Sequence, residues 1–340
     1  MAERVGIVGI GSFGTAIANL LALNTDVLVF SRRQKAVDTI NEAHSNFGQT
    51  LSPKIRATNS LEEIAGECQL IFPIVPSTSF RPMMQNLGKY LRPHHFLIHG
   101  TKGFDIIESK EKSFIKKDII STMSEVILQE SSVRRVGCLS GPNLAKEIME
   151  GQPTATLVAS QFDEVIEAGK RVLNSKLFHV YGSHDILGAE VAGALKNIVA
   201  LGSGILVGYG LGKNIQGMLI SKGLMEMIYF GRAFGAESRS FLGTAGIGDL
   251  VATATSEKSR NFTFGYRLGK GEDIDTIRQS TEELAEGVRT LRITYHLAKE
   301  RKIRLPITKM LYKVVFKGYP IGEAIEYLIK YPYDIDVDFL

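Results

Sequence analysis

The sequence VGIVGIGSFG, residues 5–14, places an apolar run directly before a glycine-rich turn. A helical pattern follows, and then a second apolar run over 27–30, so the predicted order is strand, turn, helix, strand. In such a unit Gly9 permits the tight turn, Gly11 lets the backbone approach a pyrophosphate, and Gly14 lets the helix pack on the strand. The helix N-terminus supplies unpaired N–H donors. This context predicts a dinucleotide-binding unit and disfavours a glycine turn without a ligand.

The end of the second predicted strand indicates which dinucleotide would bind. An NAD site usually has an acidic residue here, which accepts hydrogen bonds from the ribose 2′-hydroxyl. This chain has Ser31-Arg32-Arg33 instead. Guanidinium groups carry a permanent charge and forked donors that suit a 2′-phosphate, so Arg32 and Arg33 favour NADP(H), although NAD(H) stays compatible. The alternative is a solvated basic loop.

The composition indicates an ordinary folded protein of one large or two smaller domains. Of 340 residues, 44% are hydrophobic and 22% are charged, and Lys and Arg exceed Asp and Glu by only 40 to 36. So small an excess gives no support for a nucleic-acid partner. Cys68 and Cys138 form no CxxC pair and no metal-ligand cluster is visible, so we expect no metal and a reducing compartment. No signal-peptide pattern or uninterrupted apolar run of membrane-spanning length occurs, which predicts a cytoplasmic protein without membrane insertion.

The sequence pattern changes near residue 188. Before it, short apolar runs alternate with helical stretches, which predicts a mostly parallel sheet covered by helices. Besides 5–8 and 27–30, the predicted strands are 70–75, 96–99, 135–139, 154–159 and 177–181. After it come long helical stretches without a convincing strand. We therefore expect an α/β fold with a Rossmann-like domain over 1–188, an all-α domain over 189–340, and a ligand in the crevice between them. The apolar helices could bury a homodimer surface or simply one another.

The predicted chemistry of the helical half centres on Lys196. In the segment EVAGALKNIVA, residues 190–200, this lysine lies among small and apolar helical residues. Burial disfavours a lone ammonium and suits a lysine that transfers protons, so Lys196 is the predicted proton donor. The alternative is a lysine that snorkels at a helix surface. Asp249, which follows three glycines expected to form a flexible turn, could hold Lys196 or a substrate hydroxyl, and Thr253 lies one helical turn later.

Further polar groups are placed where they could contact a phosphate ester. Ser259, Arg260 and Asn261 offer hydroxyl, guanidinium and amide donors in succession. Lys102 stands in a glycine-flanked turn after a predicted strand, where open α/β sheets bind ligands. Turns at 75–77 and 140–147 follow other predicted strands. The plain alternatives are a polar loop, an exposed turn lysine and an ordinary helix start.

Eight blocks of sequence in a fixed order carry a more specific resemblance. They are GIGSFGTAIA, IVPS, TKG, SGPNLAKEI, EVAGALKNIVALGSG, GTAGIGDL, SRNFTFG and AEGVRT. Over essentially its whole length the chain resembles the bacterial-type, soluble NAD(P)-dependent glycerol-3-phosphate dehydrogenases. The resemblance implies reversible hydride transfer between the nicotinamide and C2 of a three-carbon phosphate, which interconverts glycerone phosphate and sn-glycerol 3-phosphate. It also implies a cellular role in supplying the glycerol phosphate backbone of phospholipids.

The resemblance also implies roles for individual residues. Lys196 would be the catalytic proton donor. The positions implied at the cofactor, besides the glycines, are Ser12, Phe13, Arg32, Arg33, Lys102, Ala145, Arg260, Leu284 and Glu286. The positions implied at the substrate are Lys102, Gly141, Asn143, Lys196, Asp249, Ser259, Arg260 and Asn261. The chain departs from the usual family pattern at Phe13, Asn143 and Leu284, where tyrosine or tryptophan, a hydroxyl residue and valine are frequent.

Two other functions are compatible with parts of this pattern. A related dehydrogenase for a hydroxy acid or 6-phosphogluconate would share the architecture and a helix lysine, but would need a carboxylate-binding pocket. A non-catalytic NADP(H)-sensing module would keep the glycine turn, but would not need Lys196 between a glycine-rich Asp turn and the sequence SRN. Substrate profiling separates the related dehydrogenase from a glycerol-3-phosphate dehydrogenase. Turnover of any three-carbon phosphate excludes the sensing module.

Overall fold

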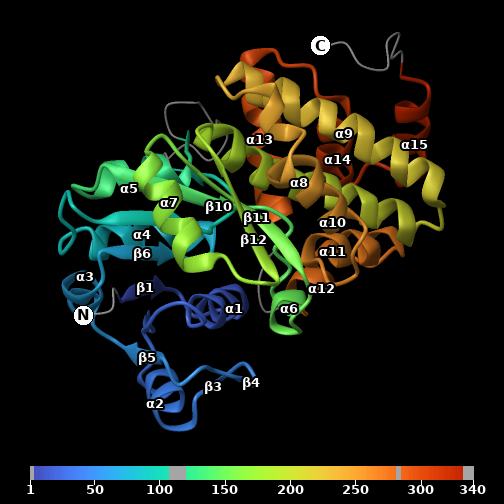
Figure 1. The fold of residues 1–340 in the computed structure, drawn as a ribbon. Helices are drawn as coiled ribbons and strands as arrows, with labels where there is room; N and C mark the ends of the chain where they lie inside the picture. Colours follow the sequence, from blue (N-terminus) through green and yellow to red (C-terminus); the bar gives the residue numbers. More distant parts are fainter. Residues whose placement is uncertain (1–3, 107–119, 281–284, 332–340) are drawn as a thin grey trace. The chain divides into compact units, whose positions relative to one another are not determined.

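The computed structural model describes residues 4–106, 120–280 and 285–331, and the chain divides into two compact units (Figure 1). The first unit comprises residues 1–105 and 121–190, and the second comprises residues 106–120 and 191–340, each as far as it is described. The division of roles at residues 188 and 189, with cofactor binding before and substrate binding after, stays a prediction.

The first unit is built on an eight-stranded sheet. In spatial order its strands are β12 (Phe178–Ser183), β11 (Thr154–Ser160), β10 (Arg135–Ser140), β7 (Phe96–His99), β6 (Leu70–Pro73), β1 (Val5–Val8), β2 (Val27–Phe30) and β5 (Ile55–Thr58). All neighbours are parallel except β10 and β11, which run antiparallel. This arrangement confirms the predicted α/β, Rossmann-like fold and all seven predicted strands. Strand β5 was missed, because its four residues, IRAT, include an exposed arginine and lack a continuous apolar run.

Helices cover both faces of this sheet because successive side chains of each strand point to opposite sides. On β1, Val5 and Ile7 join one core cluster, together with residues of α1 and α7, whereas Val8 joins another, together with residues of α3, α4 and α5. The helices of this unit are α1 (Ser12–Leu21), α2 (Gln34–Ala43), α3 (Leu61–Glu67), α4 (Ser77–Leu87), α5 (Met123–Glu130), α6 (Ala145–Met149) and α7 (Asp163–Leu173). Two small sheets are formed by β3 (Ser45–Asn46) with β4 (Gln49–Thr50) and by β8 (Asp105–Ile106) with β9 (Ile120–Ser121).

From Val191 onward the described residues of the second unit form helices joined by turns and no strand, which agrees with the predicted all-α domain. Helix α8 (Ile186–Gly208) starts in the first unit and continues into the second. The other helices are α9 (Lys213–Ala233), α10 (Asp249–Ala254), α11 (Arg260–Gly269), α12 (Ile274–Gln279), α13 (Glu286–Arg301), α14 (Pro306–Lys317) and α15 (Ile321–Ile329), with short 3₁₀ and π turns at Ser238–Phe241 and Thr244–Gly248.

Glycines in α8 and α11 allow these two helices to pack closely. A Cβ on Gly204 would lie 2.0 Å from the carbonyl oxygen of Phe262, and a Cβ on Gly265 would lie 2.0 Å from that of Leu201. Helices α8 and α11 therefore cross with their backbones in contact, which side chains at these positions would prevent. By length and composition α8 could cross a membrane, but 94% of its most apolar window is buried within the protein. Its hydrophobicity is that of a core helix, as the sequence indicates.

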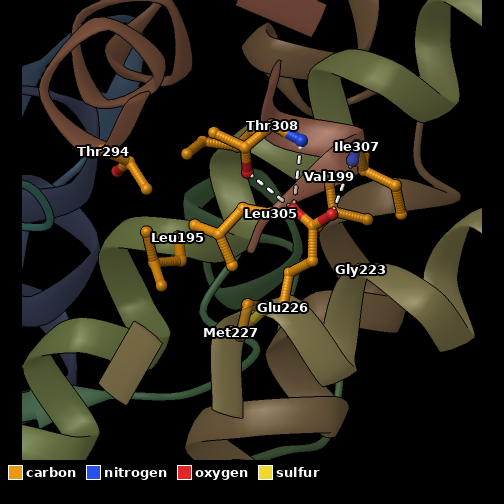
Figure 2. A pocket seen from close by; sticks show the side chains of 10 residues that line it. Leu195, Val199, Gly223, Glu226, Met227, Thr294, Leu305, Ile307 and Thr308 are labelled. Carbon is orange, nitrogen blue, oxygen red and sulfur yellow. Dashed lines mark hydrogen bonds between the residues drawn. The ribbon is translucent and has the colours of Figure 1, made fainter. Parts of the chain in front are cut away.

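A buried carboxylate caps one helix of the second unit. Helix α14 begins with Pro306 and lacks a side-chain cap of its own. Instead Glu226 of α9 accepts hydrogen bonds from the backbone N–H of Ile307 (2.5 Å) and Thr308 (3.0 Å) and from the Thr308 hydroxyl (2.7 Å), as Figure 2 shows. These donors are the ones that a helix start leaves unpaired. Beside the carboxylate is a cavity of about 10 Å³, the size of one water, which is also lined by Thr294.

Burial raises the pKa of Glu226 from 4.5 to about 7, and its three hydrogen bonds only partly oppose this shift. The folded state therefore binds this proton more tightly than the unfolded state, so the contribution of Glu226 to stability is full below pH 4.5 and is lost as the pH rises to about 7. We expect the unfolding free energy of Glu226→Gln, measured with urea from pH 4.5 to 8, to lack a decline of up to about 3 kcal/mol that the wild type shows. Parallel pH profiles of the two proteins would contradict this.

Candidate active site

The glycine turn of the first unit has the geometry of a ligand-binding loop. Gly9 has φ 112°, and a Cβ there would lie 2.1 Å from the carbonyl oxygen of Ile74. A Cβ on Gly14 would lie 2.0 Å from the carbonyl oxygen of Gly9, so the helix packs directly on the turn. By contrast, nothing lies within 4 Å of the Cβ position of Gly11, and α1 starts without a side-chain cap. The loop thus leaves open space beside a helix N-terminus whose N–H groups attract an anion. Ser12 is exposed at this end of the helix.

Asn46 holds this loop in place, although nothing in its local sequence indicates this. The hairpin of β3 and β4 turns at Phe47 and Gly48, which have φ 50° and 70°. From this hairpin the Asn46 amide donates to the carbonyl of Ile10 (3.0 Å) and to the hydroxyl of Thr15 (2.8 Å). The contacts join positions 31 and 36 residues apart, so local pattern reasoning could not find them.

At the end of β2 the structure separates a buried residue from two exposed ones. Ser31 is 6% exposed and its hydroxyl accepts a hydrogen bond from the backbone N–H of Arg33. The side chains of Arg32 and Arg33 are exposed, and neither forms an ion pair or a side-chain hydrogen bond with a residue of the described ranges. Two guanidinium groups thus lie beside one end of β2, in the solvent-accessible position that a phosphate contact requires.

Predicted residues from four strand ends come together in the first unit. The Thr101 hydroxyl donates to the Val75 carbonyl (2.7 Å), and Lys102 Nζ donates to the Gly141 carbonyl (3.0 Å). A Cβ on Gly100 would lie 3.0 Å from the ring of Phe13, so the turn before Lys102 packs against the start of α1. The turns after β1, β6, β7 and β10 therefore lie at one edge of the sheet, where parallel sheets bind ligands.

Gly141 and Asn143 shape the turn after β10. Gly141 has φ 150°, and a Cβ there would lie 3.1 Å from Thr156 Cα. The amide nitrogen of Asn143 donates to the Thr156 hydroxyl (2.8 Å), whereas its carbonyl oxygen is buried without a partner among the described residues. This oxygen is an acceptor that a ligand could use, since buried polar atoms are normally paired. Ala145 begins α6 directly afterwards. Ser77 is fully buried at the start of α4.

In the second unit Lys196 is buried and paired, so it does not snorkel at a helix surface. Lys196 is 5% exposed and Asp249 is 1% exposed. Lys196 Nζ donates to Asp249 Oδ1 (2.6 Å) and to Thr253 Oγ1 (2.5 Å), and the Thr253 hydroxyl in turn donates to Asp249 Oδ1 (3.2 Å). We call these three residues the lysine triad. A buried ammonium is tolerated because a carboxylate neutralises it, and the pairing also orients it.

The turn that precedes Asp249 is not the flexible loop that its glycines predicted. Thr244–Gly248 forms one turn of π-helix that leads directly into α10. A Cβ on Gly246 would lie 2.0 Å from the carbonyl oxygen of Phe241, so this glycine allows close packing and does not confer mobility. π turns are rare and are often found at functional sites.

The predicted phosphate donors lie at the start of α11. The Ser259 hydroxyl caps this helix by accepting from the Phe262 N–H (3.3 Å), and Arg260 is exposed in the first turn. Asn261 is buried, where its amide donates to Asn197 Oδ1 (2.9 Å) and its carbonyl accepts from the Gly287 N–H (2.8 Å). Thus Asn261 joins the residue after Lys196 to the start of α13.

The last predicted cofactor positions lie next to Gly287. Glu286 is the half-buried first residue of α13, whereas Leu284 lies outside the described residues. A Cβ on Gly287 would lie 2.6 Å from the carbonyl oxygen of Asn197, which requires a glycine here. Both cysteines are buried thiols, and the described residues contain no group of three or more His, Cys, Asp or Glu that could hold a metal.

Comparison with known proteins shows the family to which this chain belongs. Residues 4–166 match the family NAD-dependent glycerol-3-phosphate dehydrogenase N-terminus, and residues 185–326 match the corresponding C-terminus. The glycerol-3-phosphate dehydrogenase (NAD(P)+) of Staphylococcus carnosus is 37% identical over 332 residues, which cover 96% of this chain and 98% of that protein. The chain belongs to the NAD-dependent glycerol-3-phosphate dehydrogenase family. The resemblance found in the sequence is therefore confirmed.

Further members support this membership. The protein of the same name from Acinetobacter baylyi is 38% identical over 344 residues, which cover 100% of this chain and 93% of that protein. The crystal structure of glycerol-3-phosphate dehydrogenase from Coxiella burnetii has a TM-score of 0.86 at 28% identity and covers 96% of this chain and 99% of its own. A D-mandelate dehydrogenase, at a TM-score of 0.58 and 12% identity, shares the fold alone, so the similarity to a hydroxy-acid enzyme gives that alternative no support.

Proposed function

We propose that this protein catalyses the reversible, NAD(P)H-dependent reduction of glycerone phosphate to sn-glycerol 3-phosphate, and so supplies the backbone of glycerophospholipids. Family membership supports the reaction, and the observation that carries it is the lysine triad: a buried ammonium held by a carboxylate and a hydroxyl. Within this proposal residues 1–188 form the dinucleotide-binding domain and residues 189–340 form the substrate-binding and catalytic domain, and each domain adds some contacts to the ligand of the other. We also propose a cytoplasmic location. A homodimer is a further proposal, in which apolar helices of the second half would bury the subunit interface.

The residues of the first unit suit a nicotinamide dinucleotide. The open space at Gly11, the uncapped start of α1 and the Lys102–Gly141 turn form one edge of the sheet. Ser12, Phe13 and Ala145 would contact the dinucleotide from helix starts, and Glu286 would do so from α13, as Leu284 would in the segment before it. When bound, the cofactor supplies a hydride at nicotinamide C4 for C2 of the substrate. We assign the substrate-side contacts to Lys102, Gly141 and Asn143. The buried carbonyl oxygen of the Asn143 side chain would accept a hydrogen bond from the substrate.

Lys196 would donate the proton that the C2 oxygen needs as the alkoxide forms, and would take it back in the reverse direction. A fixed cation stabilises developing negative charge best where water is excluded, and Lys196 is 5% exposed. Asp249 and Thr253 hold Nζ in one orientation, so little reorganisation is needed as the charge develops. Arg260, with Ser259 and Asn261, would hold the phosphate and so place C2 for reaction.

NADPH is the cofactor that we propose the enzyme prefers, because Arg32 and Arg33 are exposed at the end of β2 and have no side-chain partner among the described residues. An absorbance assay with glycerone phosphate and each reduced cofactor tests reaction and preference together. We expect turnover with both cofactors and a higher kcat/KM with NADPH. Absence of turnover, with sn-glycerol 3-phosphate undetected as a product, would contradict the proposed function.

Replacing Arg33 by Asp should lower the ratio of kcat/KM for NADPH over NADH. The change removes a cation and adds a carboxylate that repels a 2′-phosphate but accepts hydrogen bonds from a free ribose hydroxyl. Since Arg32 can share the contact, the double variant Arg32→Ser, Arg33→Asp should complete the shift. The ratio is measured at fixed ionic strength because salt screens phosphate contacts. A ratio that neither variant changes would mean that the arginines are a solvated loop.

A further inference from the structure

Helix α10 carries Asp249 and Thr253 of the lysine triad, yet it is too short to hold its own geometry. Even with the π turn that leads into it, the helical segment runs only from Thr244 to Ala254, which is shorter than the roughly 12–15 residues that an isolated helix needs. The last carbonyl groups of any helix also lack partners within the helix. The position of Thr253 relative to Lys196 must therefore depend on contacts from other elements.

A buried pair of polar side chains provides such a contact at the end of α10. The Ser203 hydroxyl of α8 donates to the Ala254 carbonyl (2.6 Å). The Gln216 amide nitrogen of α9 donates to the Ser203 oxygen (2.8 Å) and reaches the same Ala254 carbonyl (3.4 Å). Ser203 is 0% exposed and Gln216 is 2% exposed. Two side chains from different helices therefore converge on the backbone carbonyl next to Thr253.

The orientation of the Gln216 amide follows from its neighbours. Lys213 Nζ donates to Gln216 Oε1 (3.0 Å), so the oxygen faces a cation and the NH₂ group faces two acceptors. The flipped amide would set its oxygen against the Ala254 carbonyl and its NH₂ group against an ammonium, which is unfavourable on both sides. Each polar atom of the Ser203–Gln216 pair thus has a complementary partner.

Helix α8 forms hydrogen bonds with α10 at two places. Lys196 binds Asp249 and Thr253, and Ser203, about two helical turns further along the same face, binds Ala254. A shift of the end of α10 would change the distance between Thr253 Oγ1 and Lys196 Nζ. Misplacement by about 1 Å can cost on the order of 10²-fold in rate, even when its origin is remote from the reacting atoms.

We propose that Ser203 and Gln216 are positioning residues that hold α10 so that Asp249 and Thr253 orient the Lys196 ammonium. The inference rests on the proposed role of Lys196 as proton donor. Neither side chain needs to touch the substrate, the cofactor or Lys196. The alternative is a buried polar network that supports folding alone, and the two differ in which measured quantity a substitution changes.

The test uses Gln216→Met, Ser203→Ala and their double variant in the full-length enzyme. Ser203→Ala removes a single oxygen and guards against loss of folding by the larger change. We expect each single variant to lower kcat for glycerone phosphate, and the single-turnover rate of hydride transfer, by about ten-fold. The KM for glycerone phosphate and the Kd for NADPH should stay near wild type. The double variant should be about as slow as the slower single variant, because both residues act through one carbonyl.

Thr308→Val is the matched control for stability. It removes a buried hydroxyl that bonds Glu226 in the same unit, and Thr308 has no role in the proposed site. Its Tm should fall as in the test variants, whereas kcat should not change. If Gln216→Met and Ser203→Ala lose Tm but keep kcat, the network supports folding only and the inference is wrong. Absence of glycerone phosphate turnover in the wild type would instead contradict the proposed function, and wild-type turnover of Lys196→Ala would contradict the role of Lys196, so these failures are distinguishable from one another.

Discussion

Lys196→Ala should lower kcat for glycerone phosphate reduction by about 10²- to 10⁴-fold, the usual cost of losing general acid catalysis. The Kd for NADPH should remain near wild type, because the proposed dinucleotide contacts of the glycine turn and the arginines lie in the first unit. The measurements are steady-state kinetics and cofactor titration by fluorescence. A variant that keeps wild-type turnover would remove Lys196 from the mechanism.

This substitution also affects folding, which needs its own control. Asp249 is 1% exposed, so removing Lys196 takes a cation away from a buried carboxylate, and breaking a buried ion pair in this way destabilises proteins by about 3–5 kcal/mol. In the double variant Lys196→Met, Asp249→Asn the buried charge is gone, so we expect Tm to recover in part. Activity should not recover. Recovery of both would mean that Lys196 acts on stability and not on the reaction.

Arg260→Ala should raise the KM for glycerone phosphate by about ten-fold to a hundred-fold, because a charge-assisted hydrogen bond to phosphate contributes about 1.5–3 kcal/mol. Arg260 is the first residue of α11, where a cation is unfavourable to the helix dipole. Its position is therefore not explained by helix stability, and the variant should fold normally. The Kd for NADPH is measured as well, since the resemblance to the family also implies a contact between Arg260 and the cofactor.

Two controls make this prediction specific. Arg267 lies on the same helix but is paired with Glu272, so Arg267→Ala should leave the KM unchanged. Glycerone without its phosphate should be a poor substrate for wild type and Arg260→Ala alike, because the contact that the substitution removes is absent. An unchanged KM for glycerone phosphate in Arg260→Ala would place the phosphate elsewhere.

Local sequence patterns were sufficient for the dinucleotide-binding unit. The spacing of Gly9, Gly11 and Gly14 after an apolar run requires a positive φ, an open backbone and a close helix contact in that order, and each requirement is local. The alternation of apolar strands and helices likewise predicted the α/β fold. Strand β5 was missed and the antiparallel direction of β11 was not foreseen, because pairing depends on which strand lies beside another and not on the pattern within one strand.

The pattern of the sequence favoured a buried Lys196, because small and apolar residues surround it along one helix, but it left a lysine at the helix surface as the alternative. The sequence offered Asp249 as a partner either of Lys196 or of a substrate hydroxyl. The tertiary structure shows that Asp249 and Thr253, 53 and 57 residues away, both bind the ammonium. Only the tertiary structure shows the contacts of Asn46 at the glycine turn and of Gln216 behind α10. A turn or a helix face depends on neighbours in the chain, whereas a hydrogen bond between distant side chains exists only after helices pack. For this reason the sequence indicated the chemistry, and the packing of α8, α9 and α10 decided its geometry.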